Sequence, residues 1–572
     1  MNPAQVDVVV VGAGPVGLST ALQLGRAGIR TLIVERHAGL AHHPKAIGVH
    51  ARTMELFRQF GIADAVREVG LPPERTLGFA WLTRMNGIEL GAISLAEDPA
   101  KLAEVAAHSP EPPVFAPQDR VEPVLRTAAV DTPGVELRMQ TTVTDIVQGP
   151  DDVEVSVVAG DGRAEAVRAR YVVAADGARS RIRESHGFGE VAADPYGESV
   201  NVYFRADLDE VVAGRPYLLW WIVNRDVQGA FWPTTDDGRW IFNFPGDTSK
   251  PEGYFDETLC TRLVSEATGI ADLEIELLSV LRWRHEHAVA DRWRVGRILL
   301  AGDAAHRFPP HGGFGMNNGI QDSANLAWKL AAVVRGEADE ELLDTYEAER
   351  KPVAEYNAEQ VALNTKRLEE TGWLMSDRSV LETIELPEGE SARRTIAEAI
   401  PKQREQFWSQ GQQFGQIYHD GAVVADGSEA VESSVEVYRP TTHPGARLPH
   451  IWLTDARGEA RLSTVDLLGG GFVLLTTGDS AGGWRAAAEK VAVELGVPIA
   501  VHDLGAGSSH RPVDPADLAM LEIEPGGALL VRPDSHVGFR ATTLPGDPTA
   551  ELRAALAAIL RRSRSLGQRI RR

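Results

Sequence analysis

The distribution of apolar residues predicts a buried strand, an amphipathic helix and a second strand at the start of the chain. Residues 6–11 form a continuous run that is almost wholly valine, the pattern of a parallel strand buried on both faces. A helix is predicted over residues 15–27, with its apolar side chains on the inward face, and a strand over residues 31–34. These segments predict one βαβ unit of an α/β fold.

The pattern then changes twice before residue 293. Prolines accumulate and periodicity weakens over residues 71–117, which predicts an excursion away from the first domain. Short apolar runs after this excursion predict the strands of a meander, at residues 135–137, 141–147, 153–158 and 168–174. Four further runs, rich in aromatic residues, predict a largely antiparallel sheet, at residues 200–204, 217–223, 229–233 and 240–244. Alternation along a strand places Trp220 and Trp221 on opposite faces of that sheet.

Residues 297–336 predict a strand, an acidic turn, a loop rich in proline and glycine, and then a helix. The strand ends at Gly302-Asp303, and the helix follows Asn317 with its alanines on one face. A glycine loop that points along a helix N-terminus suits an anionic or electron-rich group. Two more helical segments are predicted, at residues 344–381 and 392–410.

A new rhythm begins near residue 446, with strands and helices in the order β-α-β-β-β-α. The strands are predicted at residues 472–476, 498–503, 528–532 and 537–540, and the helices at residues 484–495 and 550–561. This order resembles a thioredoxin-like domain. The chain has one cysteine, Cys260, so the Cys-x-x-Cys motif of that family is absent and redox activity of the domain is excluded. Packing or oligomerisation remains as its role.

Composition narrows the functional classes. The chain has 572 residues, enough for roughly three or four domains of typical size. Its net charge of −23 argues against nucleic acid and anionic membrane surfaces as partners. The single cysteine permits no intrachain disulfide and fits a reducing compartment, and no run approaches the roughly 20 apolar residues that span a membrane. A cytoplasmic protein is therefore expected, as a monomer or homodimer.

The first βαβ unit carries a dinucleotide fingerprint. Gly12, Gly14 and Gly17 form a G-x-G-x-x-G turn directly after the strand, and Glu35 ends the second strand. Gly12 makes the tight turn, Gly14 lets backbone amides reach a pyrophosphate, and Gly17 allows close packing of helix and strand. Glu35 is placed to accept hydrogen bonds from ribose hydroxyls. Lys45 and Arg52 are candidates for a contact with phosphate or with the ring edge of a cofactor, and each can equally be an ordinary surface charge.

Four features in order resemble the FAD-dependent aromatic hydroxylases, the single-component flavin monooxygenases typified by para-hydroxybenzoate and phenol hydroxylases. They are GAGPVG at residues 12–17 with Glu35, Gln118 at a helix start, DGARS at residues 176–180, and GDAAH with GGFGMNNGIQD between residues 302 and 322. The resemblance covers about residues 6–365. The C-terminal part is similar to that of phenol hydroxylases and of hydroxylases that tailor aromatic polyketides, such as the tetracenomycin type.

The resemblance implies an α/β fold of three domains and a helical connector. A Rossmann-like FAD-binding domain is expected at residues 1–70, 118–185 and 290–365. A mostly antiparallel substrate domain is inserted into it, at residues 71–117 and 186–289. A helical connector is expected at residues 366–440, and the thioredoxin-like domain at residues 441–572.

The resemblance also implies which residues hold the cofactor. The expected FAD contacts are Gly12, Gly14, Pro15, Val16, Gly17, Glu35, Arg36, Lys45, Arg52, Gln118, Val143, Asp176, Gly177, Asp303, Pro310, Gly313, Gly315, Met316 and Asn317. Many relatives carry arginine at the position of Lys45, and lysine lacks the planar fork that a bidentate or stacking contact needs. Trp221, Phe231, Trp232 and Pro233 of the aromatic-rich sheet are the candidate substrate contacts, with burial in the core of that sheet as the alternative for each ring. No metal site is expected.

The implied reaction is hydroxylation of an electron-rich aromatic ring. NADPH or NADH reduces FAD, the reduced flavin captures O2 as a C4a-hydroperoxide, and this species transfers oxygen to the small aromatic substrate. His306 and His311 flank the loop as candidate bases, and each can equally be structural. A polycyclic aromatic polyketide of antibiotic biosynthesis is the expected substrate, with a simple phenol or chlorophenol as the alternative. An FAD dehydrogenase or oxidase, and a flavin-binding protein without activity, are the alternatives of other classes.

Overall fold

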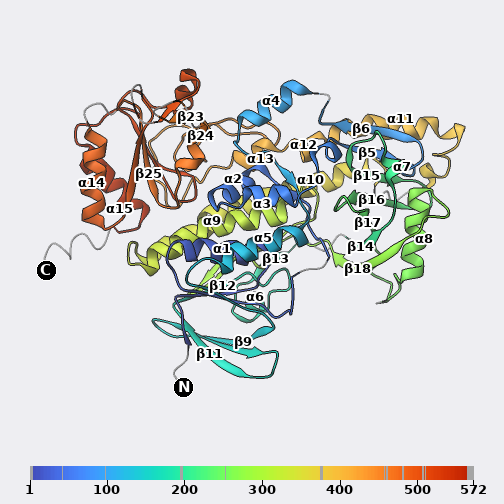
Figure 1. Cartoon of the computed structure of the whole chain (residues 1–572), viewed down its shortest axis with the longest axis horizontal. Coiled ribbons are helices and arrows are strands. Elements are labelled where there is room, and N and C mark those ends of the chain that lie inside the picture. The colour runs from blue at the N-terminus through green and yellow to red at the C-terminus, as the bar shows by residue number, and fades with distance from the viewer. Residues whose placement is uncertain are drawn as a thin grey trace.

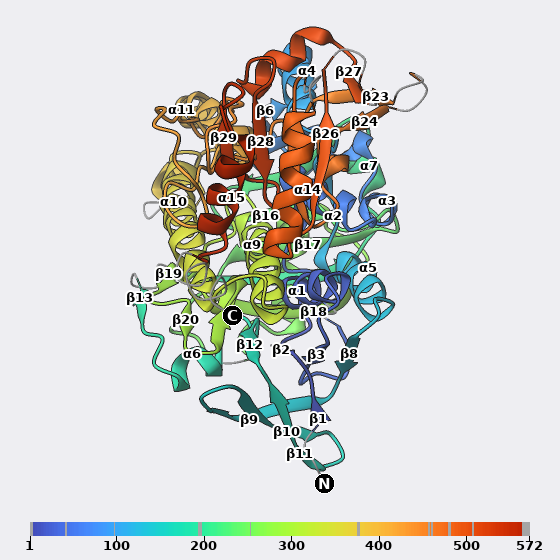
Figure 2. The same ribbon diagram turned by 90° about the vertical axis from the view of Figure 1, so that its left-hand side faces the viewer.

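The computed structural model describes residues 4–40, 43–96, 98–192, 197–251, 253–373, 378–455, 458, 461–478, 482–505, 508 and 510–562. Figure 1 shows a central body of long helices and strands, a large sheet at one end and the C-terminal α/β body at the other. In the turned view of Figure 2, α14 (Gly483–Leu495) and α15 (Pro548–Ile559) run alongside the C-terminal sheet, far from the N-terminus. No helix among these described residues is long and apolar enough to cross a membrane.

The central sheet is parallel apart from one edge strand. Its strands in spatial order are β20 (Arg294–Val295), β21 (Ile298–Leu300), β12 (Tyr171–Ala174), β2 (Val8–Val11), β3 (Thr31–Val34) and β8 (Val135–Arg138). Val10 pairs with Ile33 on one side and Val173 on the other. All four residues of β2 are buried, which explains why its run is continuously apolar. The predicted βαβ unit is confirmed, with α1 at Pro15–Arg26.

Two predictions about the meander were wrong. The run at residues 168–174 is divided between β11 (Ala164–Ala169) and β12, which belong to different sheets. The predicted strand at residues 135–137 is β8 of the central sheet. The separate antiparallel sheet contains β9 (Thr141–Gln148), β10 (Val153–Ala159) and β11, with β1 (Ala4–Gln5) at its edge. Strand pairing depends on distant residues, which a local pattern does not report.

The large sheet at one end of the molecule is antiparallel except where β15 pairs with β5. Its strands in order are β18 (Glu276–Arg284), β14 (Glu198–Arg205), β17 (Arg239–Pro245), β16 (Gln228–Pro233), β15 (Tyr217–Val223), β5 (Gly78–Leu82) and β6 (Glu89–Ser94). The excursion at residues 71–117 therefore supplies two strands. Trp220 packs in the core under α8 (Glu257–Thr268) and Trp221 in the core on the other face, as alternation predicted.

The C-terminal sheet has the predicted order of elements. Its strands in space are β26 (Ile499–Asp503), β25 (Phe472–Thr476), β28 (Ala528–Val531) and β29 (Val537–Ala541). β25 runs parallel to β26 and antiparallel to β28. The ring of Phe472 lies 5.7 Å from that of Trp328, and both belong to one hydrophobic core that continues into the central body.

The long helices differ in extent from the prediction. α9 spans Phe314–Val334, so it begins three residues before Asn317. α10 spans Asp344–Glu369 and does not continue to residue 381; part of that predicted extension, residues 374–377, lies outside the described residues. The segment predicted as one helix at residues 392–410 is divided into α11 (Glu390–Ala399), a 3-10 turn at Ile400–Gln403 that contains Pro401, and α12 (Arg404–Phe407). Proline lacks the N–H that a helix interior needs.

Candidate cofactor and substrate site

The glycine turn after β2 forms an open cradle at the N-terminus of α1. A Cβ on Gly12, whose φ is +108°, would lie 2.3 Å from the Ala175 carbonyl oxygen. A Cβ on Gly17 would lie 2.0 Å from the Gly12 oxygen, whereas a Cβ on Gly14 would meet nothing within 4 Å. Packing inside the protein therefore requires Gly12 and Gly17. Gly14, the N-cap of α1, leaves the helix end open to an anionic group.

Glu35 is tied to this turn. Its Oε2 accepts a hydrogen bond of 2.9 Å from the Ala13 amide, and its backbone oxygen accepts one of 2.8 Å from Thr141. Thr141 begins β9, and Val143 lies two residues after it in the same strand. Arg36, next to Glu35 in the chain, is exposed. The predicted residues at the nucleotide end thus lie together.

Three loops meet at the carboxyl edge of the central sheet. β2, β12 and β21 are adjacent and parallel, so the glycine turn, the Asp176-Gly177 loop and the Asp303 turn all emerge at one edge. Arg183 ties two of these loops, because its guanidinium donates to Ala178 O at 2.9 Å and to Ala304 O at 3.0 Å. Burial raises the pKa of Asp176, and its Oδ1 is fully buried without a partner among the described residues. Gly177 has a φ of +83°.

The Asp303 turn and α1 are packed against each other. A Cβ on Gly302 or Gly319 would come within 2.8 Å of a Val16 methyl group, so Val16 fills the space between α1, the turn and α9. Asp303 is exposed to solvent, yet protein surrounds it closely enough that burial raises the pKa of its carboxyl group. An accessible carboxylate enclosed in this way is typical of the wall of an internal site.

The N-terminus of α9 lies beside this turn. Gly313, at a φ of +72°, caps the helix, and a Cβ on Gly315 would meet nothing within 4 Å. Asn317 is fully buried: its Oδ1 accepts from the His50 amide at 2.9 Å, and its Nδ2 donates to Gly313 O at 2.7 Å. The Asn317 side chain therefore holds the loop in shape and is not free for a cofactor. The unpaired amides at the start of the helix, including that of Met316, remain available. Pro310 is exposed in the same loop.

The three other predicted cofactor residues have different environments. Lys45 is exposed. The Gln118 amide donates to Ala46 O at 2.8 Å, and its side chain donates to Glu122 at 2.5 Å, so it supports the loop that carries Lys45. Arg52 does not match its prediction: it is buried, pairs with Glu55 at 2.9 Å and donates to the backbone of the C-terminal body. A side chain used in this way has no donor directed at a phosphate.

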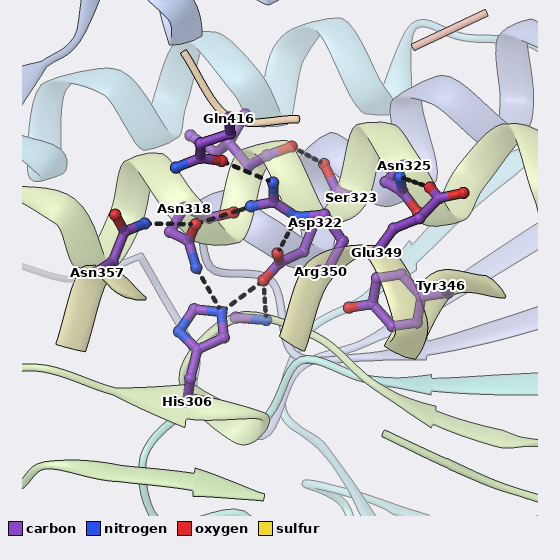
Figure 3. Close-up of polar contacts among 12 residues, drawn as sticks. His306, Asn318, Asp322, Ser323, Asn325, Tyr346, Glu349, Arg350, Asn357 and Gln416 are labelled. Atoms are coloured by element: carbon purple, nitrogen blue, oxygen red, sulfur yellow. Dashed lines mark hydrogen bonds and ion pairs between the residues drawn. The ribbon is translucent and has the colours of Figure 1, made fainter. Parts of the chain in front are cut away.

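His306 belongs to a buried polar network behind the loop (Figure 3). Its Nε2 lies 2.6 Å from Asp322 Oδ2, and Arg350 donates to Asp322 Oδ1 at 2.9 Å and to Asn318 Oδ1 at 2.7 Å. Burial raises the pKa of Asp322, but the charges of His306 and Arg350 outweigh it and lower the pKa below its ordinary value. His306 has no exposed surface. It therefore positions the turn and is not a base for a substrate.

His311 has a different environment on the other side of the loop. Its Nδ1 lies 2.7 Å from the Thr365 hydroxyl oxygen, and that hydroxyl donates to Val361 O at 3.0 Å. Because the hydroxyl hydrogen is used for Val361, His311 Nδ1 must carry the proton and Nε2 the lone pair. Burial and the nearby His285 lower the pKa of His311 to about 3, so its ring is neutral. The two imidazole rings lie 6.3 Å apart.

The large sheet presents a polar face toward this loop. Ser199 of β14 lies 2.8 Å from His285 Nε2, and His285 faces His311. Two residues along the strand, Asn201 lies on the same face and pairs with Asn243 of β17. Sequence reasoning missed these residues, and only Asn201 and Asn243 gave a signal, as a polar residue between two apolar ones in a predicted strand.

The four predicted substrate residues are divided between the faces. Trp221 and Trp232 lie on the face that carries Ala230, and Trp232 is half-buried. Phe231 has no exposed surface and stacks on Phe242 in the core under α8. Pro233 points the same way as Phe231 and lines a surface cavity of about 470 Å³ with Tyr217 and Trp240. A strand alternates its side chains, so these two predictions were wrong.

Comparison with known families decides what this site is for. A family model described as FAD binding domain matches residues 5–361, more than half of the chain, and one described as aromatic-ring hydroxylase, C-terminal, matches residues 441–563. The chain belongs to the family of FAD-binding aromatic-ring hydroxylases. The site fits FAD: Gly14 leaves the pyrophosphate cradle open, Asp176 keeps an unpartnered buried oxygen, and Asp303 presents an accessible carboxylate at the same edge of the sheet. FAD is the cofactor of this hydroxylase.

Relatives of this hydroxylase match it along nearly their whole length. The tetracenomycin A2 monooxygenase-dioxygenase of Streptomyces glaucescens is 37% identical, over 98% of both chains. The 2,4-dichlorophenol 6-monooxygenase of Cupriavidus pinatubonensis is 32% identical, over 98% of this chain and 97% of its own. Among solved structures, the flavin-dependent monooxygenase PieE in complex with FAD and substrate has a TM-score of 0.90 at 32% identity, over 97% of this chain and 99% of its own.

Proposed function

We propose that this hydroxylase inserts one oxygen atom of O2 into an electron-rich ring of a polycyclic aromatic polyketide, with NADPH or NADH as electron donor. The observation that carries the proposal is the polar sheet face of Ser199 and Asn201. Through His285 and His311, this face meets the loop of residues 308–313 before α9, which we call the flavin loop. A flat ligand between that face and the loop contacts both hydrogen-bonding groups and the cofactor edge. The tetracenomycin relative supports a polyketide as the ligand.

The proposed division of labour follows the three bodies in Figure 1. Residues 1–70, 118–185 and 290–365 form a Rossmann-like FAD-binding domain, and residues 71–117 and 186–289 form the substrate-binding domain. Residues 366–440 connect these to a thioredoxin-like domain at residues 441–572. The sheet order β26-β25-β28-β29, with one parallel pair, supports the last assignment.

Bound FAD supplies the activation of oxygen by reduced flavin, and the chain's own residues hold and orient it. Gly14 and the amides of α1 hold the pyrophosphate, Glu35 a ribose hydroxyl, and Asp303 a hydroxyl of the ribityl chain. The amides at the start of α9 stabilise negative charge at the flavin ring edge, because the positive end of the helix dipole points there.

His311 accepts a hydrogen bond from a substrate hydroxyl in this proposal. Its Nε2 carries a lone pair because Thr365 and Val361 fix the proton on Nδ1, and it lies on the flavin loop between Pro310 and Gly312. Donating this hydrogen bond makes the substrate oxygen more electron-rich, which prepares its ring for electrophilic attack. The proton stays on the substrate oxygen, because the His311 ring, with its pKa lowered to about 3, is too weak a base to remove it.

A simple phenol is the second candidate substrate, because the dichlorophenol monooxygenase aligns with almost the entire chain. The deciding experiment measures NADPH and NADH consumption by the FAD-loaded enzyme with polycyclic phenols and with simple phenols. The same reactions are run under isotopically labelled oxygen gas, and the product mass is measured. One labelled oxygen atom in a polycyclic product supports the proposal.

Two results would count against it. Labelled product from simple phenols alone would favour the second candidate, a hydroxylase of simple phenols. Consumption of electron donor with hydrogen peroxide as the only oxygen product, for every ring tested, would favour a dehydrogenase or oxidase. Protein that does not bind FAD at all would remove the basis of both.

A further inference from the structure

We infer that Asn201, Asn243 and Trp283 form a unit that recognises a substrate edge carrying one hydrogen-bond acceptor and one donor. This inference rests on the proposed function, because it takes the space between the large sheet and the flavin loop as the substrate pocket. It adds which polar groups the substrate presents there.

The two asparagines are placed side by side by strand register. Asn201 of β14 pairs with Asn243 of β17, and the residues before and after each of them are apolar and pack on the opposite face under α8. The asparagines therefore share a face with Ser199, which reaches the flavin loop through His285. Asn201 is 4% exposed and Asn243 8% exposed, so both amides are largely withdrawn from water.

Trp283 fixes the orientation of both amides. Its indole Nε1 is a donor only, and it lies 3.3 Å from Asn201, so the atom of Asn201 that faces it must be Oδ1. That same oxygen lies 2.5 Å from Asn243, so the facing atom of Asn243 must be the donor Nδ2. One indole N–H thus determines which end of each amide points away from the pair.

The outward atoms are then a donor and an acceptor. Asn201 Nδ2 and Asn243 Oδ1 have no hydrogen-bond partner in the described parts of the chain, and neither is among the fully buried polar atoms there. Both therefore keep contact with accessible space. Since an unmet polar group in a closed site is costly, a ligand that fills the pocket is expected to supply an acceptor to Asn201 and a donor to Asn243.

A ring carbonyl and a ring hydroxyl on one edge of a polycyclic aromatic compound meet this requirement. An unsubstituted hydrocarbon edge leaves both amides unpaired. A methoxy group in place of the hydroxyl sets an acceptor against the Asn243 oxygen. A simple monohydric phenol has one hydroxyl to serve both amides, as the donor to Asn243 and as the acceptor from Asn201.

The test measures dissociation constants of the FAD-loaded oxidised enzyme for three probes by the change in flavin absorbance. The probes are 2-hydroxyanthraquinone, 2-methoxyanthraquinone and anthraquinone, at a pH where the hydroxyl is not ionised. We expect 2-hydroxyanthraquinone to bind roughly tenfold more tightly than either of the others, which corresponds to one net hydrogen bond plus the relief of an unpaired group. Equal affinities in the wild-type enzyme would overturn the inference without any variant.

Variants assign the preference to the asparagines. Asn243→Leu is expected to remove the discrimination between the hydroxy and methoxy probes and to leave anthraquinone binding within about twofold. Gln228→Leu is the matched control, because Gln228 is an amide of the same sheet whose Oε1 and Nε2 are both fully buried. It is expected to leave the discrimination intact. Preserved discrimination in Asn243→Leu would contradict the inference.

The proposed function is tested separately in the same preparations. Incorporation of labelled oxygen with unchanged probe selectivity in Asn243→Leu would leave the hydroxylase assignment standing and remove only this inference. Failure of the wild-type protein to bind FAD or to form labelled product would instead overturn the proposed function.

Discussion

At the scale of single residues, the three glycines of one motif have different tasks. Gly12 and Gly17 face backbone atoms of the protein, and Gly14 faces open space at the end of α1. The motif predicts all three, but spacing alone does not separate the glycine that the fold needs from the glycine that the cofactor needs. Only the positions of neighbouring atoms do.

Gly14→Ala separates these two tasks. The φ of Gly14 is −74°, which alanine adopts without strain, and the added methyl group meets no protein atom. We expect the free energy of unfolding of the FAD-free protein to change by no more than about 1 kcal/mol. FAD should bind more than about tenfold more weakly, because the methyl group occupies the place of the pyrophosphate. Isothermal calorimetry with FAD and a thermal melt without it measure both.

Gly17→Ala is the control for this variant. Its methyl group would lie 2.0 Å from the Gly12 oxygen, so the FAD-free protein itself should be destabilised by several kcal/mol. Undiminished FAD affinity in Gly14→Ala would show that the cofactor does not lie in this cradle.

His311→Leu tests the hydrogen-bond acceptor. Leucine has a similar size but no acceptor, so substrate hydroxylation should fall by roughly tenfold, the worth of one hydrogen bond, while reduction of FAD by the electron donor stays unchanged. Thr365→Val removes the hydroxyl that fixes the tautomer of His311, so the rate of hydroxylation should fall by a smaller factor. Thr365→Ser keeps a hydroxyl there and should restore that rate. Rapid-mixing kinetics of the two half-reactions give each value. A full rate in His311→Leu would show that His311 does not contact the substrate hydroxyl.

At the scale of elements, the sequence predicts existence and type better than partners. Most strands of the central sheet and of the large sheet were predicted within one or two residues, because buried β-branched and aromatic runs are local signals. The start of α9 was not, because it depends on Gly313 in the left-handed region and on the bond from Asn317 to Gly313. Arg52 was misassigned for a related reason, since its partner Asp534 comes from a distant part of the chain. The sequence left His306 open between a base and a structural residue, and its bond to Asp322 of α9 decides for the structural role.

A buried charge cluster joins α9, α10 and the C-terminal body. Glu349 accepts from Lys329 at 2.7 Å and from Arg532 at 2.9 and 2.7 Å, and all three side chains are fully buried. Burial raises the pKa of Glu349, but the charges of Arg532 and Lys329 outweigh it and lower the pKa to about 2. The cluster therefore holds the two helices behind the flavin loop only while Glu349 is ionised.

Acid should weaken this cluster in a defined range. A carboxyl group whose pKa falls on folding stabilises the native state fully at pH values above its ordinary pKa of 4.5. This contribution is lost as the pH falls toward the folded-state pKa of about 2. We expect Glu349→Gln to cost on the order of 3 kcal/mol at neutral pH, with the difference from wild type shrinking below pH 4.5. Urea unfolding at several pH values measures it. Glu340→Gln, in an ion pair whose carboxylate is 44% exposed, should change stability by less than about 1 kcal/mol. A pH-independent difference for Glu349→Gln would contradict the assignment.

At the scale of the whole molecule, the C-terminal body is fastened to the cofactor domain by buried ion pairs and a shared core. Arg447 donates to Glu55 of α2 (Ala51–Gln59) at 2.9 Å, and Arg532 pairs with Glu349 of α10. The core that contains Phe472 and Trp328 crosses the same boundary. This arrangement explains how a domain without redox residues contributes to a flavin enzyme: it clamps the helices that carry the flavin loop.

Such fastening predicts that the FAD-binding and C-terminal parts unfold as one cooperative unit. Wild-type protein should show a single calorimetric transition that FAD shifts upward as a whole, because FAD binds only the folded state. Replacing both Arg447 and Arg532 with methionine leaves carboxylates buried without their main partners, at about 3–5 kcal/mol for each pair. The transition should then divide into two, of which FAD shifts one. Replacing Arg553, whose ion pair with Glu494 is exposed at the surface of α15, should leave a single transition. Two independent transitions in the wild-type protein would show that the C-terminal body is attached to the FAD domain without being coupled to it.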